Sequence, residues 1–393
     1  MRRVLLVTYH FPPSAASGTF RLLGFARHLP KFDWQVSVLA PPELPWEPVD
    51  QALMAQVPPH TDVHFVAYPR DAFKVLRWAA PWGVWLRPAW QKCRRVVLRE
   101  TPDVVLTSGP PHCVHALGYH LKRRFGVPWI ADFRDPWIQA GGKAPRGVAG
   151  IWARHWERRV LRRADLILAN APNATAALRQ AYPRCADKIE TLTNGYDPLP
   201  AGAAAHLSGP FRLVHAGELY AGRDPRPLFD AMCVAGTTEC VLDIVGRTSQ
   251  CGVDMEREIA QRGLTERVRL RGQVVYAEAR QAMLDADILV LFDAPGRTIG
   301  VPAKVYEYLA TGRPVLAITE EDSDTANILA QSGVTHRIVS PSRPAGLTEA
   351  LADLSARKST SARKPVLSPF TRENLAARLS TLMTRICQQP LAV

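Results

Sequence analysis

The stretch Val301–Ile318, VPAKVYEYLATGRPVLAI, predicts one short helix followed by a buried strand. Pro302 suits the first turn of the helix, where its missing N–H group costs no hydrogen bond. Gly312 suits the left-handed position that ends a helix, and Pro314 prevents the helix from continuing. The apolar residues that follow then form the strand.

Lys304 and Glu307 lie three residues apart on one face of this helix, close to its N-terminus. A phosphate group at this place would find the Lys304 ammonium and free backbone N–H groups, and Glu307 could accept hydrogen bonds from ribose hydroxyls. The glycine-bearing loop Ala294–Gly300 precedes the helix. These features predict a nucleotide site, and the alternative is an ion pair on a solvated helix face.

Length and composition indicate an ordinary soluble protein with two domains. The 393 residues are 47% hydrophobic and 22% charged, and no window reaches the ~18 consecutive apolar residues that span a bilayer. The N-terminal run Val4–Val7 is too short for a signal peptide and predicts a first strand. The seven cysteines form no CxxC pair, which argues against a disulfide framework or a zinc site and favours a reducing cytoplasm.

Charge and tryptophan are concentrated in the first half. Residues 1–198 hold 27 Lys and Arg against 15 Asp and Glu, the remainder holds 22 against 21, and all ten tryptophans lie before residue 157. The segment Arg70–Glu100 combines eight basic residues with Trp78, Trp82, Trp85 and Trp90. Such a segment suits an anionic membrane or a lipid-linked acceptor. The alternative is a helical flap with a solvated basic side, and nucleic acid is not expected because no reading module accompanies the charge.

Strand-like and helical runs alternate along the chain, which predicts an α/β protein with parallel sheets covered by helices. Residues 198–210, PLPAGAAAHLSGP, have the composition of a hinge. We therefore expect two Rossmann-like domains, 1–198 and 199–370. Residues 371–393 form an amphipathic helix that packs back across them.

Two stretches of the first domain are candidates for ligand contact. The loop HFPPSAASG ends in Gly18 before a helix, where backbone N–H groups could approach an anionic ligand. It lacks the GxGxxG pattern, and an ordinary strand–helix connection is the alternative. Asp132, Arg134 and Asp135 follow the predicted strand Val127–Ala131, and ligands bind beyond the carboxyl ends of parallel strands. These side chains suit substrate contact or proton transfer, unless Arg134 only bridges the two aspartates.

Two further features involve histidine and glycine. His112 and His115 bracket a cysteine after a strand, which suggests a metal ligand or a base, or else side chains satisfied by backbone and solvent. In the second domain the loop GELYAGRD has two glycines, including Gly217, and a cation, Arg223, before a helix. This is an arrangement that binds a diphosphate.

The motifs NGYD, HAGELYAGRDP and VPAKVYEYLATGRPVLAI together resemble the GT-B glycosyltransferases, specifically family 4 (group 1). YHFPPSAASGTFR, IADFRDPW and KIETLTNGYDP look like a bacterial subgroup. The resemblance implies that a nucleotide sugar binds in the C-terminal domain facing an interdomain cleft, and that the N-terminal domain holds the acceptor. It also implies retention of anomeric configuration.

The resemblance assigns roles residue by residue. Glu307 matches the carboxylate that holds the donor ribose, Lys304 and Arg223 would lie near the diphosphate, and Gly217 is a further donor-binding residue. Gly18 lets the backbone approach the donor phosphate or the acceptor. These cations would stabilise the leaving nucleotide without an obligatory metal, and no cofactor other than the nucleotide sugar is implied.

The chain departs from the family pattern at three places. Glu218 stands where an arginine is usual after Gly217, and Ile299 replaces the first member of the paired glutamates. Arg134 replaces the usual histidine. We therefore expect Asp132, Arg134 and Asp135 to take the catalytic role.

These observations predict a cytoplasmic hexosyltransferase of polysaccharide biosynthesis, peripheral on the inner face of the membrane. Its acceptor would be a cell-envelope or exopolysaccharide glycan, or a lipid-linked one. One alternative is a sugar-nucleotide epimerase of the same fold. Another is a non-catalytic protein that binds sugar nucleotides.

Overall fold

The computed structural model describes residues 1–44, 47–69, 83–138, 147–198, 211–234, 240–356 and 369–388. The chain divides into two compact units. Unit 1 is Met1–Gly195 together with the C-terminal segment from Arg372, and unit 2 is Tyr196–Thr371. The predicted hinge lies outside the described residues, apart from Pro198.

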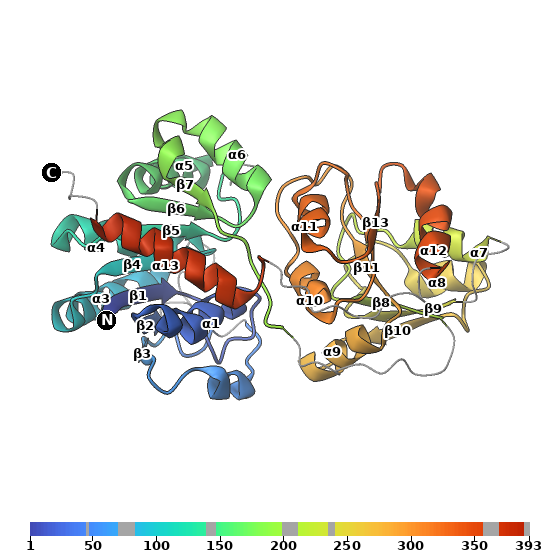
Figure 1. Cartoon of the computed structure of the whole chain (residues 1–393), viewed down its shortest axis with the longest axis horizontal. Helices are drawn as coiled ribbons and strands as arrows, with labels where there is room; N and C mark the ends of the chain where they lie inside the picture. Colours follow the sequence, from blue (N-terminus) through green and yellow to red (C-terminus); the bar gives the residue numbers. More distant parts are fainter. Residues whose placement is uncertain are drawn as a thin grey trace. The chain divides into compact units, whose positions relative to one another are not determined.

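Unit 1 is built on a seven-stranded parallel sheet (Figure 1). Its strands are β1 (Arg2–Thr8), β2 (Trp34–Ala40), β3 (Asp62–Phe65), β4 (Val104–Gly109), β5 (Trp129–Phe133), β6 (Leu166–Ala169) and β7 (Ile189–Thr191). The order across the sheet is β3-β2-β1-β4-β5-β6-β7, so the winding direction reverses between β1 and β4. The central strands are apolar because helices cover both faces.

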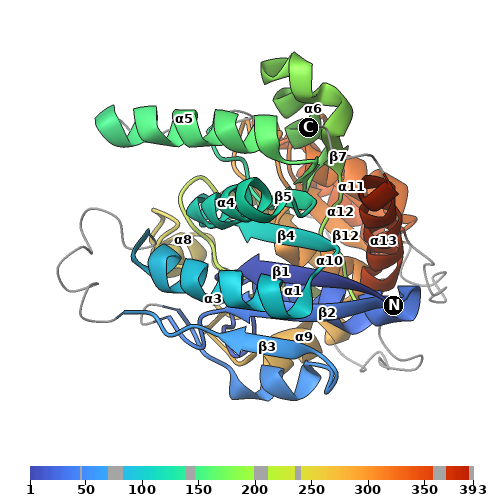
Figure 2. The same ribbon diagram turned by 90° about the vertical axis from the view of Figure 1, so that its left-hand side faces the viewer.

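Helices α3, α4 and α5 lie together on one face of this sheet, and α13 lies on the other (Figure 2). The helices are α1 (Thr19–His28), α3 (Leu86–Glu100), α4 (His115–Phe125), α5 (Gly147–Arg163), α6 (Pro172–Ala181) and α13 (Arg372–Gln388), with short 3-10 turns η1 (Leu29–Phe32), η2 (Gln51–Gln56), η3 (Gly83–Trp85), η4 (His112–Val114) and η5 (Pro183–Lys188). Alternate strand residues such as Val4 and Leu6 pack against α1 and α13.

The C-terminal helix α13 returns to unit 1, as the sequence predicts. It packs along α1 and buries Leu379 and Met383 completely. Trp34 Nε1 donates to Ser380 Oγ at 3.0 Å, which ties the start of β2 to this helix. The last segment of the chain therefore completes the core of the first unit.

Unit 2 repeats the design with six parallel strands (Figure 1). They are β8 (Phe211–Ala216), β9 (Cys240–Val245), β10 (Val268–Gly272), β11 (Ile288–Phe292), β12 (Val315–Ile318) and β13 (His336–Val339). The order is β10-β9-β8-β11-β12-β13, with the reversal between β8 and β11. The helices are α7 (Arg226–Cys233), α8 (Met255–Gln261), α9 (Tyr276–Asp285), α10 (Ala303–Thr311), α11 (Asp324–Ser332) and α12 (Leu347–Ala356), with η6 (Pro344–Gly346).

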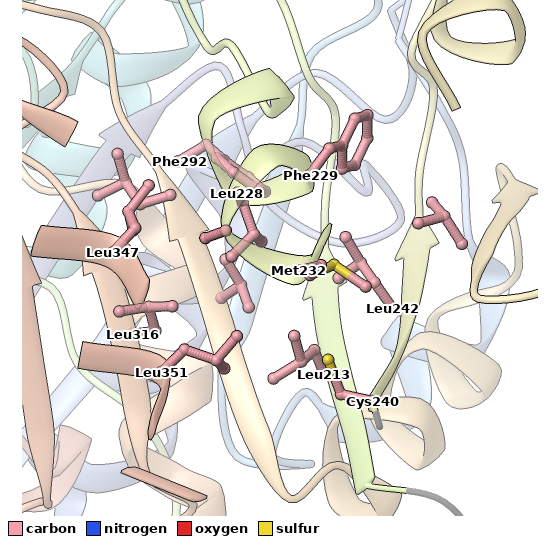
Figure 3. Packing of buried hydrophobic residues seen from close by; sticks show 14 of the residues in the cluster. Leu213, Leu228, Phe229, Met232, Cys240, Leu242, Phe292, Leu316, Leu347 and Leu351 are labelled. Carbon is pink, nitrogen blue, oxygen red and sulfur yellow. The ribbon is translucent and has the colours of Figure 1, made fainter. Parts of the chain in front are cut away.

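The core of unit 2 lies between its sheet and the helices α7 and α12 (Figure 3). Leu213 and Leu242 project from neighbouring strands toward Met232 of α7, while Leu316 meets Leu351 of α12. All five side chains are less than 2% exposed. This packing fixes the sheet from which the loops at its carboxyl edge extend.

The predicted helix and strand in Val301–Ile318 are confirmed as α10 and β12. Gly312 ends α10 with φ 65°, the left-handed conformation that glycine adopts without strain. Val305 and Leu309 are 1% and 2% exposed, so this face of α10 packs into the core. The opposite face remains available for the polar side chains.

The tryptophans of Arg70–Glu100 do not form one exposed surface in the described part of the chain. Trp85 is fully buried and donates from Nε1 to Val66 O at 2.8 Å, so this tryptophan does not belong to an exposed basic, aromatic surface. Trp78 and Trp82 lie outside the described residues. Among the described helices, none is long and apolar enough to cross a bilayer.

Candidate functional site

In unit 2, the loops after β8 and β11 flank the point where the strand order reverses. Open parallel sheets bind ligands at this point, beyond the carboxyl ends of the strands. Tyr308 of α10 joins the two strands there, because its hydroxyl accepts from Ala216 N at 2.9 Å and donates to Val290 O at 3.1 Å. α10 is thereby held against this edge.

Position 217, directly after β8, requires a glycine because the chain is closely packed on two sides of it. Its φ is 136°, and a Cβ there would lie 1.9 Å from Lys304 Nζ. On the other side, a Cβ on Gly246 would lie 2.3 Å from Gly217 O. Because neither Gly217 nor Gly246 has a side chain, the loop after β8, the loop after β9 and Lys304 can approach one another closely.

Lys304 Nζ is buried and has no hydrogen-bond partner among the described residues, although the side chain as a whole is only partly buried. Burial, followed by the charge of Arg223, lowers the pKa of this ammonium to about 7. Glu307, Asp293 and Glu218 act in the opposite direction. A buried donor without a partner is costly, and an anion placed beside Gly217 would satisfy it.

Arg223 supplies a second buried cation, with only 3% of the residue exposed. Its guanidinium lies 3.9 Å from the centre of the Tyr220 ring and 4.0 Å from Asp293 Oδ1. Asp293 also accepts from Arg297 Nη1 at 2.7 Å. Asp293 was not predicted as a site residue. It directly follows the buried strand β11, and this position after a strand is the sequence signal that could have identified it.

The N-cap residue of α10 does not cap the helix through its side chain. Pro302 is the N-cap residue and makes no side-chain capping bond. Backbone N–H groups at such a terminus favour an anion. Glu307 is half-buried one turn further on. The structure therefore groups the predicted residues Gly217, Arg223 and Lys304 in unit 2, with Glu307 on the same helix as the lysine.

In unit 1, Asp132 lies within β5 rather than beyond it, because the strand pairs with β4 as far as Phe133. Its carboxylate is fully buried and accepts from Arg21 Nη2 at 2.8 Å, from Arg21 Nε at 3.0 Å and from Ser108 Oγ at 2.7 Å. Arg21 also donates to Thr193 O at 2.6 Å. These contacts link β4, β5 and α1 to the segment after β7, which gives Asp132 a structural function.

Arg134 is 5% exposed and lies against Gly18 at the start of α1. A Cβ on Gly18 would lie 1.4 Å from Arg134 Nη1. The guanidinium donates to Gly109 O at 3.3 Å and to Pro110 O. Burial is the largest cause that lowers the pKa of Arg134 to about 10, while Asp132 raises it. Gly18 thus makes room for this arginine.

The remaining predicted residues lie near Arg134. Asp135 is exposed, and its charge acts on the pKa of Arg134. Trp137 stacks on His112 with ring centres 5.0 Å apart, and Thr107 Oγ1 lies 2.9 Å from His115 Nδ1. Burial lowers the pKa of His112 to about 3 and that of His115 well below its ordinary value, so both rings are neutral at pH 7.

Another titratable pair at this edge was missed by sequence reasoning. His10 Nδ1 lies 3.1 Å from Glu47 Oε2, across the loops that follow β1 and β2. No sequence spacing links residues 37 positions apart in different loops. In the described part of the chain, no three His, Cys, Asp or Glu side chains group so as to hold a metal ion.

Comparison with known proteins identifies the chain. The family described as "Glycosyl transferase 4-like domain" matches residues 19–195, and "Glycosyl transferases group 1" matches residues 210–357. The chain is a group 1 glycosyltransferase of the family 4 type. The predicted family and the predicted GT-B fold with its two α/β units are thereby confirmed.

Solved structures are similar to this glycosyltransferase over nearly its whole length. Sucrose-phosphate synthase from Thermosynechococcus elongatus has a TM-score of 0.70 at 17% identity, covering 98% of this chain and 99% of that one. Anabaena HepE in complex with UDP-glucose has a TM-score of 0.57 at 17% identity, covering 99% and 98%.

A putative UDP-N-acetylglucosamine 2-epimerase from Listeria monocytogenes has a TM-score of 0.60 at 13% identity, covering 100% and 98%. At these identities the likeness shows the fold alone. Among curated proteins, none matches the glycosyltransferase sequence.

Proposed function

We propose that the protein transfers a hexose from a nucleoside diphosphate sugar to a hydroxyl of a cell-envelope or exopolysaccharide glycan, or of a lipid-linked acceptor. The single observation that carries the donor half is the buried Lys304 Nζ beside Gly217, which has no hydrogen-bond partner among the described residues. The complex of HepE with UDP-glucose, a protein of the same fold, supports this donor class.

The donor diphosphate would bind between the loop after β8 and the N-terminus of α10. Lys304 and Arg223 would bind its oxygens, together with backbone N–H groups near Gly217, and Glu307 would accept from the ribose hydroxyls. These cations stabilise the charge that develops on the leaving diphosphate. Two such buried cations supply the charge that a metal ion provides in other sites, so we expect transfer without an added metal. Retention of configuration is the expected outcome.

Nucleotide release tests the proposal. The full chain is incubated with UDP-, GDP- and dTDP-sugars in the presence of EDTA, and the released nucleoside diphosphate is measured. We expect release from at least one donor, and at least a tenfold loss of release in Glu307→Ala, because a hydrogen bond to a charged group contributes about 1.5–3 kcal/mol. Glu266→Ala, on an exposed turn, is the matched control.

The same experiment distinguishes the two alternatives. An epimerase would convert the donor into an isomeric nucleotide sugar without releasing nucleotide, which anomeric NMR signals would reveal. A binding protein would show donor binding by calorimetry and no turnover. If no donor of the panel is bound or turned over, the proposed function is wrong.

We extend the proposal to an anionic membrane surface, through the basic face formed by exposed residues of α3, α4 and α5. Its exposed arginines are Arg94, Arg95, Arg99, Arg123, Arg124, Arg158, Arg159, Arg162 and Arg163. Leu98, Ile151 and Trp152 are 66%, 62% and 49% exposed on the same helices. Exposed apolar side chains beside arginines suit insertion at a charged lipid interface.

Vesicle co-sedimentation tests this face. We expect binding to vesicles that contain phosphatidylglycerol, reduced by salt and by the double variant Ile151→Ser/Trp152→Ser, and little binding to phosphatidylcholine alone. Val234→Ser/Val275→Ser, two exposed apolar residues of unit 2, is the control. Equal binding to both vesicle types would refute the proposal.

A further inference from the structure

Asp293, the residue that follows β11 in unit 2, has one carboxylate oxygen that is satisfied and one that is not. The side chain is only 1% exposed. Its Oδ1 accepts from Arg297 Nη1 at 2.7 Å and from Ala294 N at 3.1 Å. Its Oδ2 is buried and has no hydrogen-bond partner among the described residues. Buried polar atoms are normally paired, and one left without a partner is costly.

Other carboxylates hold the loop that begins with Asp293. Glu320 Oε1 accepts from Gly296 N at 2.9 Å, and Asp324 Oδ2 accepts from Gly300 N at 2.8 Å. Because the loop is fixed at these two points and Oδ1 is held by two donors, the direction of Oδ2 is set before any ligand binds.

Asp293 belongs to the proposed donor site. β11 is one of the two strands of unit 2 between which the strand order reverses, and open parallel sheets bind ligands there. Burial lowers the pKa of both Arg223 and Lys304, and the nearby charge of Asp293 acts to raise both. Arg223 Nη2 lies 4.0 Å from Asp293 Oδ1, which is too far for a hydrogen bond. The carboxylate therefore lies beside the proposed diphosphate cations, while its Oδ2 remains unpaired.

The chemistry of this oxygen restricts which part of a nucleotide sugar can reach it. An ionised carboxylate accepts hydrogen bonds and donates none, and it repels phosphate oxygens. The ribose hydroxyls are assigned to Glu307 in the proposed function, and the ribose separates the nucleobase from the diphosphate. The transferred sugar is joined directly to the diphosphate and carries hydroxyl groups. A sugar hydroxyl is therefore the donor that fits Asp293 Oδ2.

We infer that Asp293 Oδ2 accepts a hydrogen bond from one hydroxyl of the transferred sugar, and that Asp293 thereby selects which donor sugar is bound. This inference rests on the proposed function. A sugar that presents a hydroxyl at this point satisfies the buried oxygen. A sugar without that hydroxyl leaves the oxygen unpaired, and sites built to hydrogen-bond a substrate hydroxyl reject analogues that lack it for this reason.

The test measures the Kd of the full chain by calorimetry for UDP-glucose, or for whichever donor of the panel releases nucleotide fastest. The same donor is then used in deoxyfluoro forms, each with fluorine in place of one sugar hydroxyl, because fluorine is similar in size and cannot donate a hydrogen bond. At least one of these analogues should bind the wild type about tenfold or more weakly than the parent donor, the range of a hydrogen bond to a charged group. Binding is measured because fluorine also slows the transfer step itself.

Asp293→Asn shows whether this residue senses the missing hydroxyl. Arg297 and Ala294 N both donate to Oδ1, so the asparagine should keep its carbonyl oxygen there and place its amide nitrogen at the position of Oδ2. An amide N–H can face fluorine, and the loss of affinity for the weakest analogue should therefore fall below about threefold. The Kd for the free nucleoside diphosphate should stay the same or decrease, because a negative charge beside the phosphates is removed.

Asp230→Asn is the matched control, because this aspartate of unit 2 has a 63% exposed side chain. It should keep the wild-type Kd for every ligand. Thermal melting shows whether each variant is folded. If Asp293→Asn does not fold, Asp293→Ser, which lacks Oδ2, is compared in its place, and the wild type with the fluorinated donors still tests the inference.

The outcomes separate this inference from the proposed function. If the wild type turns over a donor but no fluorinated form binds more than threefold more weakly, or if the full loss persists in Asp293→Asn, the inference is wrong and the proposed function stands. If Asp293→Asn weakens the binding of the sugar donor and of the free nucleoside diphosphate equally, Asp293 only holds the cations in place, and the inference is also wrong. If the wild type binds no donor, the proposed function and this inference both fail.

Discussion

Replacing Lys304 by methionine removes a buried positive charge from the proposed donor site, while methionine fills a similar volume. Nζ is buried without a hydrogen-bond partner among the described residues, and its pKa falls from 10.5 to about 7. The unfolded chain therefore keeps a proton that the folded chain releases as the pH rises above 7. Lys304 thus lowers the stability of unit 2 in the absence of a ligand.

The magnitude follows from the pKa. One pKa unit corresponds to about 1.4 kcal/mol, so the buried ammonium costs on the order of 4 kcal/mol at pH 7. This cost is fully present below the folded-state pKa of about 7 and declines as the pH rises toward the unfolded value of 10.5. Between pH 7 and pH 9, the wild type should gain about 2 kcal/mol relative to Lys304→Met.

Urea unfolding at pH 7, 8 and 9 measures this difference. It should be followed by circular dichroism, because all ten tryptophans precede unit 2 and fluorescence would report only on unit 1. Lys304→Met should be more stable than the wild type at pH 7, and the gap should narrow with pH. Lys31→Met, a lysine with a 52% exposed side chain, should show no such trend. A gap that is absent at pH 7, or constant with pH, would refute the reasoning.

Two further substitutions test the packing around each site. Gly217→Ala should destabilise unit 2 by about 1–3 kcal/mol, because φ is 136° and the new Cβ would lie 1.9 Å from Lys304 Nζ. Gly263→Ala is the control for backbone strain, because Gly263 has a positive φ and open space around it. If Gly217→Ala loses no more stability than Gly263→Ala, the predicted clash with Lys304 is wrong. Arg21→Met should lower the free energy of unfolding in urea by about 3–5 kcal/mol, because it leaves Asp132 buried without its cation. The double variant Arg21→Met/Asp132→Leu should recover part of that stability. If Arg21→Met has wild-type stability, the pair is not structural.

The strands could be predicted because a buried parallel strand is an uninterrupted apolar run. Ile288–Phe292, for example, is a strand of five fully buried residues. Strand β5 shows where this signal fails. The predicted strand ended at Ala131 because Asp132 reads as a loop residue, yet β5 continues to Phe133. Arg21, 111 positions away, neutralises that aspartate, and no local pattern reveals such a partner.

The candidate residues of unit 2 could be selected from local sequence patterns, whereas the polar contacts of unit 1 could not. Gly217, Arg223 and Lys304 lie in loops and helix ends whose glycine, cation and proline spacing reflects local backbone geometry. The contacts of Asp293 and the pairing of His10 with Glu47 depend on which loops meet at the reversal of strand order. That order is set by the sheet, and the sequence carries no local signal for it.

The central claim is that the buried ammonium of Lys304 binds a diphosphate. A crystal structure of the chain with UDP bound tests it most directly. The account predicts a diphosphate oxygen within hydrogen-bond distance of Lys304 Nζ, beside Gly217, with a ribose hydroxyl on Glu307. A nucleotide bound elsewhere in unit 2, with Lys304 Nζ still buried and unpartnered, would contradict it.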